Sequence, residues 1–168
     1  MNRKNINSKE GFTIIEVVLV LAIAGLIFLM VFIALPALQR SQRDTQRRDD
    51  MARFLSQLNQ YQANNSGRVP TDYGDFISDY LEVGGDTFND PSTGETYTIA
   101  SKITDCSDSN EKPNCAAGKN AELSGTMGEI NVYTNAKCEG EDAVYIQGDR
   151  KIAIRIKLEG AGVYCGNS

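Results

Sequence analysis

The sequence contains no histidine and no tryptophan. Without histidine, the chain lacks the side chain that most often serves as a general base or a metal ligand near neutral pH. It also shows no nucleophile–base pair, no phosphate-binding loop and no metal-ligand cluster of recognisable spacing. We therefore expect a structural or binding protein rather than an enzyme. We expect no cofactor either, apart from the calcium candidates considered below.

The four cysteines, Cys106, Cys115, Cys138 and Cys165, all lie in the polar part of the chain. Their spacing matches neither a zinc knuckle nor a CxxC redox pair. An even number of cysteines beyond an apolar N-terminal segment favours disulfides formed in an oxidising compartment. Of the three possible pairings, we favour Cys106 with Cys115 and Cys138 with Cys165. Free buried thiols are the alternative.

A long apolar run occupies residues 12–38. Few residues of another kind interrupt it: Thr13, Glu16, Gly25 and Pro36. Residues 17–35 alone would form a helix of about 28 Å, close to the thickness of a hydrocarbon core. The run does not end in the small-residue site at which a secretory signal is cut. We expect a membrane helix that stays in the protein, with a kink near Pro36 and a second weak point at Gly25.

Residues 39–66 continue the helical pattern with one mostly apolar face, made by Met51, Phe54, Leu55, Leu58, Tyr61 and Gln62. One helix is therefore expected from about residue 12 to about residue 64, followed by a head of residues 67–168. We expect strands at residues 96–100, 129–134, 143–147 and 151–159, with Gly148 and Asp149 as a hairpin turn between the last two. This pattern predicts an α+β fold in which a long N-terminal helix packs on a small antiparallel sheet.

The last expected strand alternates most clearly. Ile152, Ile154, Ile156 and Leu158 share one face, for which the apolar face of the helix is the expected cover. Lys151, Ala153, Arg155 and Lys157 share the other face, which is expected to be polar.

Charge is distributed unevenly along the chain. The net charge is −5, but residues 1–60 are net positive and residues 61–168 are net negative. An acidic head is a poor surface for phosphate backbones, so direct nucleic-acid binding is not expected. The arginines that follow the apolar run are Arg40, Arg43, Arg47, Arg48 and Arg53. We expect a helix surface with local pairs such as Arg40 with Asp44, facing neighbouring subunits or lipid headgroups.

The stretch "GFTIIE" at residues 11–16, followed by the apolar run, resembles the processing site of type IV pilins and pseudopilins. The layout of the chain is also similar to theirs, with a short basic leader, an apolar helix, an antiparallel sheet and late cysteines. The resemblance implies that a prepilin peptidase cuts between Gly11 and Phe12, removes residues 1–11 and methylates the new amine of Phe12. Residues 12–38 would then be the membrane and filament-core helix.

Glu16 acquires a role from this resemblance. A lone carboxylate in a bilayer costs about 2.5–3.5 kcal/mol, so a partner is expected. The amine that cleavage creates at Phe12 is such a partner, within one chain or between neighbours. A subunit in the wrong axial register would leave both the Glu16 carboxylate and the Phe12 amine unpaired. Glu16 is therefore expected to set the axial register of the subunits. The alternative is that Glu16 lies at the level of the lipid headgroups.

The resemblance implies a structural subunit of a type IV pilus, with identical subunits, an assembly ATPase and a membrane platform as partners. Such filaments serve adhesion, twitching motility or DNA uptake. The subunit would be a single-pass protein of the cytoplasmic membrane, with its N-terminus inside and its head outside, and would enter the extracellular pilus on assembly. The alternatives are a pseudopilin or minor pilin of a type II secretion or competence apparatus, and an anchored binding protein with a single membrane span.

Some pseudopilins hold calcium in their heads, and their acidic loops are broadly similar to residues 86–95 of this chain. The oxygen ligands available here would be Asp86, Asn89, Asp90 and Glu95. Their spacing is not that of an EF-hand. We favour an ordinary turn over residues 90–94, with Pro91 in the second position.

Overall fold

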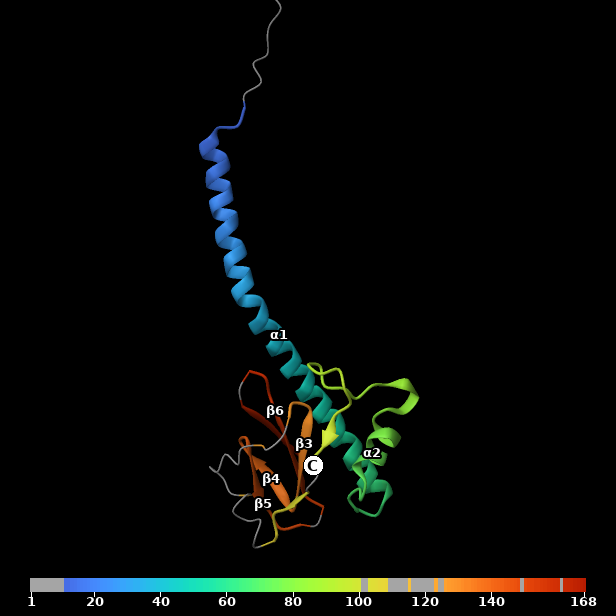
Figure 1. Ribbon diagram of the computed structural model, residues 1–168. Helices are drawn as coiled ribbons and strands as arrows, with labels where there is room; N and C mark the ends of the chain where they lie inside the picture. Colours follow the sequence, from blue (N-terminus) through green and yellow to red (C-terminus); the bar gives the residue numbers. More distant parts are fainter. Residues whose placement is uncertain are drawn as a thin grey trace, which may run out of the picture. The chain divides into compact units, whose positions relative to one another are not determined.

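The computed structural model describes residues 11–100, 103–108, 115, 123, 126–148, 150–160 and 162–168. The chain forms two compact units, residues 1–39 and residues 40–168. The helical elements are α1 (Ile14–Asn64), α2 (Tyr73–Tyr80) and the short 3-10 helix η1 (Val83–Gly85) (Figure 1). The strands are β1 (Thr98–Ile99), β2 (Thr104–Asp105), β3 (Glu129–Thr134), β4 (Ala136–Glu139), β5 (Asp142–Tyr145), β6 (Ile152–Lys157) and β7 (Val163–Asn167).

Helix α1 begins and ends within two residues of the expected positions, and it includes both Gly25 and Pro36. The kinks expected at these two residues stay predictions. At the C-terminal end of α1, the Gly67 amide donates to the Gln62 carbonyl over 2.7 Å. Gly67 has a φ of 82°, a conformation that glycine adopts at low cost and that commonly ends helices.

The short helix α2 begins directly after Asp72. Asp72 is the cap: its Oδ1 accepts hydrogen bonds from the amides of Gly74, at 2.8 Å, and Asp75, at 3.3 Å. These bonds satisfy donors that the first turn of a helix leaves free.

The main sheet has the order β1-β3-β6-β7, and β2 also pairs with β3. Strand β6 is antiparallel to both of its neighbours, β3 and β7. The antiparallel pairing of β3 with β6 agrees with the expected sheet, whereas β7 was not expected from the sequence. The short strands β1 and β2 run parallel to β3, so the sheet is mixed rather than purely antiparallel. The α+β architecture, with a long helix against a small sheet, is confirmed.

The core of the head lies between the expected faces of helix and sheet. Met51, Phe54 and Leu58 of α1 are fully buried, as are Ile154 and Ile156 of β6. Phe76 of α2 joins them: the ring centroids of Phe54 and Phe76 are 5.3 Å apart, and the two rings meet edge to face. The alternation along β6 and the helical period along α1 therefore correctly predicted which residues of each element form this core.

The opposite face of the sheet differs from the expectation, because it is covered rather than exposed. Strands β4 and β5 pair with each other in a separate two-stranded sheet. Beneath them, Ala153 is buried and Arg155 is only 2% exposed. The Arg155 Nε donates to the Glu141 carbonyl over 2.7 Å, which supplies a partner for a buried guanidinium. The charged side chain of Arg155 led us to expect a solvent-exposed face, but the β4–β5 sheet covers this residue.

The expected hairpin between β5 and β6 is also wrong. Strand β5 pairs with β4, and β6 pairs with β3 and β7. The tight turn lies one connection earlier, between Glu139 and Asp142, where Gly140 has a φ of 64°. Asp149, the second residue of the expected turn, lies outside the described residues.

Both favoured disulfides are present. Cys106 bonds to Cys115, and Cys138 bonds to Cys165. The second bond ties β4 to β7, so it fastens the covering hairpin to the edge of the main sheet. All four cysteines are therefore in disulfides, and the alternative of free buried thiols is wrong.

Candidate functional site

The expected processing site lies just before the first turn of α1. Gly11 and Phe12 are outside the helix, and the Phe12 side chain is 90% exposed. Residues 1–10 of the expected leader lie outside the described residues. The bond between Gly11 and Phe12 is therefore in non-helical, exposed backbone, which a peptidase can enter more easily than a helix.

Thr13 and Glu16 form a capping box at the start of α1. The Thr13 amide donates to Glu16 Oε2 over 2.9 Å, and the Thr13 hydroxyl donates to the same oxygen over 2.8 Å. In return, the Glu16 amide donates to the Thr13 hydroxyl over 3.4 Å. Two side chains thus satisfy each other's backbone donors, a recurrent way to start a helix.

Thr13 was not identified from the sequence as a functional residue, although its signal was there. A threonine followed three residues later by a glutamate, directly before an apolar run, is the sequence form of a capping box. Glu16 therefore has a hydrogen-bonding partner within its own first turn. Both Thr13 hydrogen bonds end on Oε2, and among the described residues no hydrogen bond ends on Oε1.

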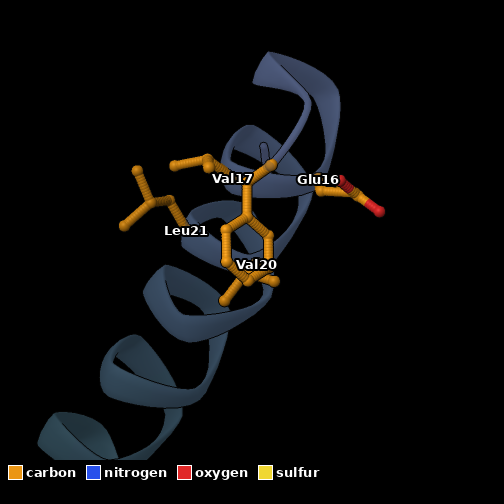
Figure 2. Close-up of a pocket in the computed structure, with 5 residues that line it drawn as sticks. Glu16, Val17, Val20 and Leu21 are labelled. Atoms are coloured by element: carbon orange, nitrogen blue, oxygen red, sulfur yellow. The ribbon is translucent and has the colours of Figure 1, made fainter. Parts of the chain in front are cut away.

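A hollow beside the first turns of α1 is lined by Phe12, Glu16, Val17, Val20 and Leu21. Its lining is apolar except for the carboxylate. Glu16 and Leu21 point to different sides of the helix (Figure 2). The arrangement places one charged group beside apolar surface that an apolar side chain of another molecule can cover.

Among the described residues of its unit, none covers the apolar segment. Its large side chains are exposed from Phe12, at 90%, to Leu38, at 59%. Helix α1 contains a stretch long and apolar enough to span a membrane, near the N-terminus. The chain therefore carries an apolar helix whose surface needs lipid or other protein, consistent with anchoring by a single membrane span.

The arginine run is not the uniform helix surface expected from the sequence. Arg47 is fully buried and bonds to both carboxylate oxygens of Asp90, at 2.6 and 2.9 Å. It also contacts Asp44 at 3.1 Å and Glu159 at 3.1 Å. Arg43 forms two hydrogen bonds to Glu159. These arginines attach two loops of the head to α1, a role that helical spacing could not reveal.

Burial and hydrogen bonding act in opposite directions on this cluster. Burial alone would raise the pKa of Asp90, but hydrogen bonds from Arg47 and Ser92 outweigh it and lower the pKa to about 2. Burial would likewise lower the pKa of Arg47, but the carboxylates of Asp90 and Glu159 raise it. Both groups are therefore held in their charged forms across the neutral range.

Two of the calcium candidates, Asp86 and Asp90, are engaged in other contacts. The Asp90 carboxylate accepts from Arg47 and from the amides of Ser92 and Thr93, and Asp86 pairs with Arg53 at 3.0 Å. The Gly94 amide donates to the Asp90 carbonyl over 2.8 Å, which closes the expected turn. Within the described ranges, no group of three or more acidic or cysteine side chains is arranged to hold a metal. The loop therefore serves as a turn that binds an arginine.

No family model, no curated protein and no solved structure matches this chain.

Proposed function

We propose that this chain is a pilin-like structural subunit, which polymerises through its N-terminal helix into a surface filament for adhesion, twitching motility or DNA uptake. A single observation carries the proposal: the "GFTIIE" motif opens an apolar helix whose large side chains are exposed among the described residues. In a bilayer, lipid covers this surface; in a filament, the helices of identical subunits cover it. No catalytic role is proposed.

Maturation begins with a prepilin peptidase, which cuts between Gly11 and Phe12 on the cytoplasmic side and methylates the amine of Phe12. The exposed, non-helical backbone at these residues supports access by such an enzyme. Until assembly, the chain stays in the cytoplasmic membrane with its head outside. An assembly ATPase and a membrane platform then move it from lipid into the extracellular filament.

Glu16 sets the axial register of the incoming subunit. Its Oε2 accepts the two capping hydrogen bonds from Thr13 at the start of α1. The other oxygen, Oε1, is then available to pair with a Phe12 amine. In a low-dielectric bundle, an amine and a carboxylate that miss each other are both costly, so subunits pack where the two groups meet. The cap and the charge pair therefore use different oxygens of one carboxylate.

Two measurements test the proposal. Mass spectrometry of the purified protein should give a chain that starts at a methylated Phe12; a start at Met1 or within the head would overturn it. Filaments sheared from producing cells should be lost on Glu16→Gln substitution. Glutamine still accepts the capping hydrogen bonds but carries no charge.

Thr13→Ala is the matched variant, since it removes the cap and keeps the charge. It should leave more filament than Glu16→Gln does. If Glu16→Gln assembles normally, the charge has no role in assembly, and an anchored binding protein becomes the better interpretation. A pseudopilin or minor pilin would share the processing, and deletion of the chain would then abolish secretion or uptake without removing a long surface filament.

A further inference from the structure

The five arginines after the apolar segment fall into two groups. Arg43 and Arg47 bind carboxylates of the head, and Arg53 binds Asp86 and the Leu81 carbonyl. Arg40 and Arg48 are exposed, and in the described part of the chain neither has a hydrogen-bond or ion-pair partner. The head therefore uses three of these charges and leaves two for other molecules.

Asp44 explains why Arg40 is left unpaired. At four residues' distance it was the expected partner on the helix surface. Its carboxylate instead accepts hydrogen bonds from the amides of Glu159 and Gly160, both at 2.8 Å, and from Arg47 at 3.1 Å. Asp44 is only 7% exposed as a result. The carboxylate nearest in sequence is thus committed to the head.

The position of Arg40 in the chain indicates what it meets. Residues 17–38 form about 33 Å of helix, which matches the hydrocarbon core of a bilayer. Arg40 follows Leu38 by two residues, about 3 Å further along a helix, where the phosphates of the outer leaflet lie. Its neighbours Gln39, Ser41 and Gln42 carry no charge. Arg48 is about 12 Å beyond Arg40 along a helix and so outside this zone.

We propose that Arg40 binds the phosphate of an outer-leaflet phospholipid while the subunit waits in the membrane. The guanidinium presents its donors in a planar fork that matches two phosphate oxygens. Its long stem lets the charge reach the headgroup from a helix position close to the hydrocarbon. This inference rests on the membrane anchoring in the proposed function, and it adds a lipid contact that must break when the subunit leaves the bilayer.

Native mass spectrometry of the full chain in detergent tests the inference. The probes are phosphatidylglycerol, phosphatidylcholine and diacylglycerol, the last of which has the same chains but no phosphate. The wild type should retain both phospholipids in preference to diacylglycerol. Arg40→Gln should weaken phosphatidylglycerol binding by about fivefold, the effect of one basic residue at a lipid surface. Arg48→Gln is the matched control and should bind like the wild type.

Each of the following outcomes overturns the inference. Equal lipid retention by the wild type and Arg40→Gln shows that Arg40 does not bind the phosphate. An equal loss in Arg48→Gln shows a general charge effect instead of a site. Thermal unfolding checks that both variants keep the wild-type stability, as expected for exposed side chains.

Carbonate washing of membranes tests the membrane anchoring separately. If the chain stays in the membrane but does not prefer phospholipid to diacylglycerol, the Arg40 inference alone is refuted. If the chain washes off the membrane, the anchoring in the proposed function is refuted as well.

Discussion

The guanidinium of Arg47 and the carboxylate of Asp90, 43 residues apart in the sequence, form a two-bond ion pair inside the head, with N–O distances of 2.6 and 2.9 Å. Neither side chain is more than 1% exposed. The pair joins α1 to the loop before β1. Because both side chains are buried, removing one of them would leave the other charge without a partner and without hydration, which would destabilise the head.

Arg47→Gln should destabilise the head by about 3–5 kcal/mol, because it leaves a buried carboxylate without its cation. Urea unfolding followed by tyrosine fluorescence measures this without interference, since the chain has no tryptophan. Arg48→Gln, one residue along and exposed, should change the unfolding free energy by less than about 0.5 kcal/mol. Similar losses in the two variants would show that the ion pair contributes little.

Acid should destabilise the head through Asp90. Its folded pKa of about 2 is below the value of about 3.9 in an unfolded chain, so the folded state holds this proton less readily. The resulting stability is complete above about pH 5 and is lost progressively as the pH falls towards about 2, a change of about 2 kcal/mol. Hydrogen bonds from Arg43 lower the pKa of Glu159 as well, so it adds a loss of the same sign.

Asp90→Asn should reduce this acid dependence without removing it, because Glu159 still titrates. Urea midpoints measured between about pH 2 and about pH 5 give the slope for each protein. A slope in Asp90→Asn equal to that of the wild type contradicts the assignment to Asp90.

Thr13→Ala should loosen the first turn of α1. The substitution removes the hydroxyl from the capping box, which costs about 1 kcal/mol. Hydrogen exchange of the full chain in detergent should then be about fivefold faster at residues 15–17, and unchanged in the head. Thr13→Ser keeps the hydroxyl and should exchange like the wild type. An unchanged first turn in Thr13→Ala would mean that the cap does not hold the helix start.

The two disulfides should differ in their contribution to stability. Replacing Cys138 and Cys165 by serine opens a loop with a sequence separation of 27, against 9 for Cys106 and Cys115. The loop-entropy relation gives about 3.6 kcal/mol for the longer loop and about 2.7 kcal/mol for the shorter one. Urea unfolding of the two double variants compares them directly.

The Cys138–Cys165 bond also holds the hairpin that covers Arg155. Limited trypsin digestion should therefore cut after Arg155 faster in the variant that lacks this bond than in the variant that lacks the shorter one. Equal rates would indicate that strand pairing alone keeps the hairpin in place.

Much of the fold follows from local patterns. The apolar run, the helical period of Met51 to Leu58 and the alternation of β6 each depend on neighbours in sequence, and each predicted the correct element. The favoured cysteine pairs are also present in the structure. The errors involve contacts between distant segments. The parallel pairing of β1 and β2 with β3, and the cover that β4 and β5 place over Arg155, depend on how the chain returns to the sheet.

The sequence by itself determined the capping box at the start of α1, because Thr13 and Glu16 are three residues apart and need no other part of the chain. Only the tertiary structure decided which arginines are free. On a helix surface, Arg40, Arg43, Arg47 and Arg48 are equivalent cations, but Asp90 and Glu159 arrive from 43 and 116 residues away and bind two of them. Burial makes these pairs specific, since a guanidinium removed from water must find a carboxylate, whereas an exposed one keeps its hydration.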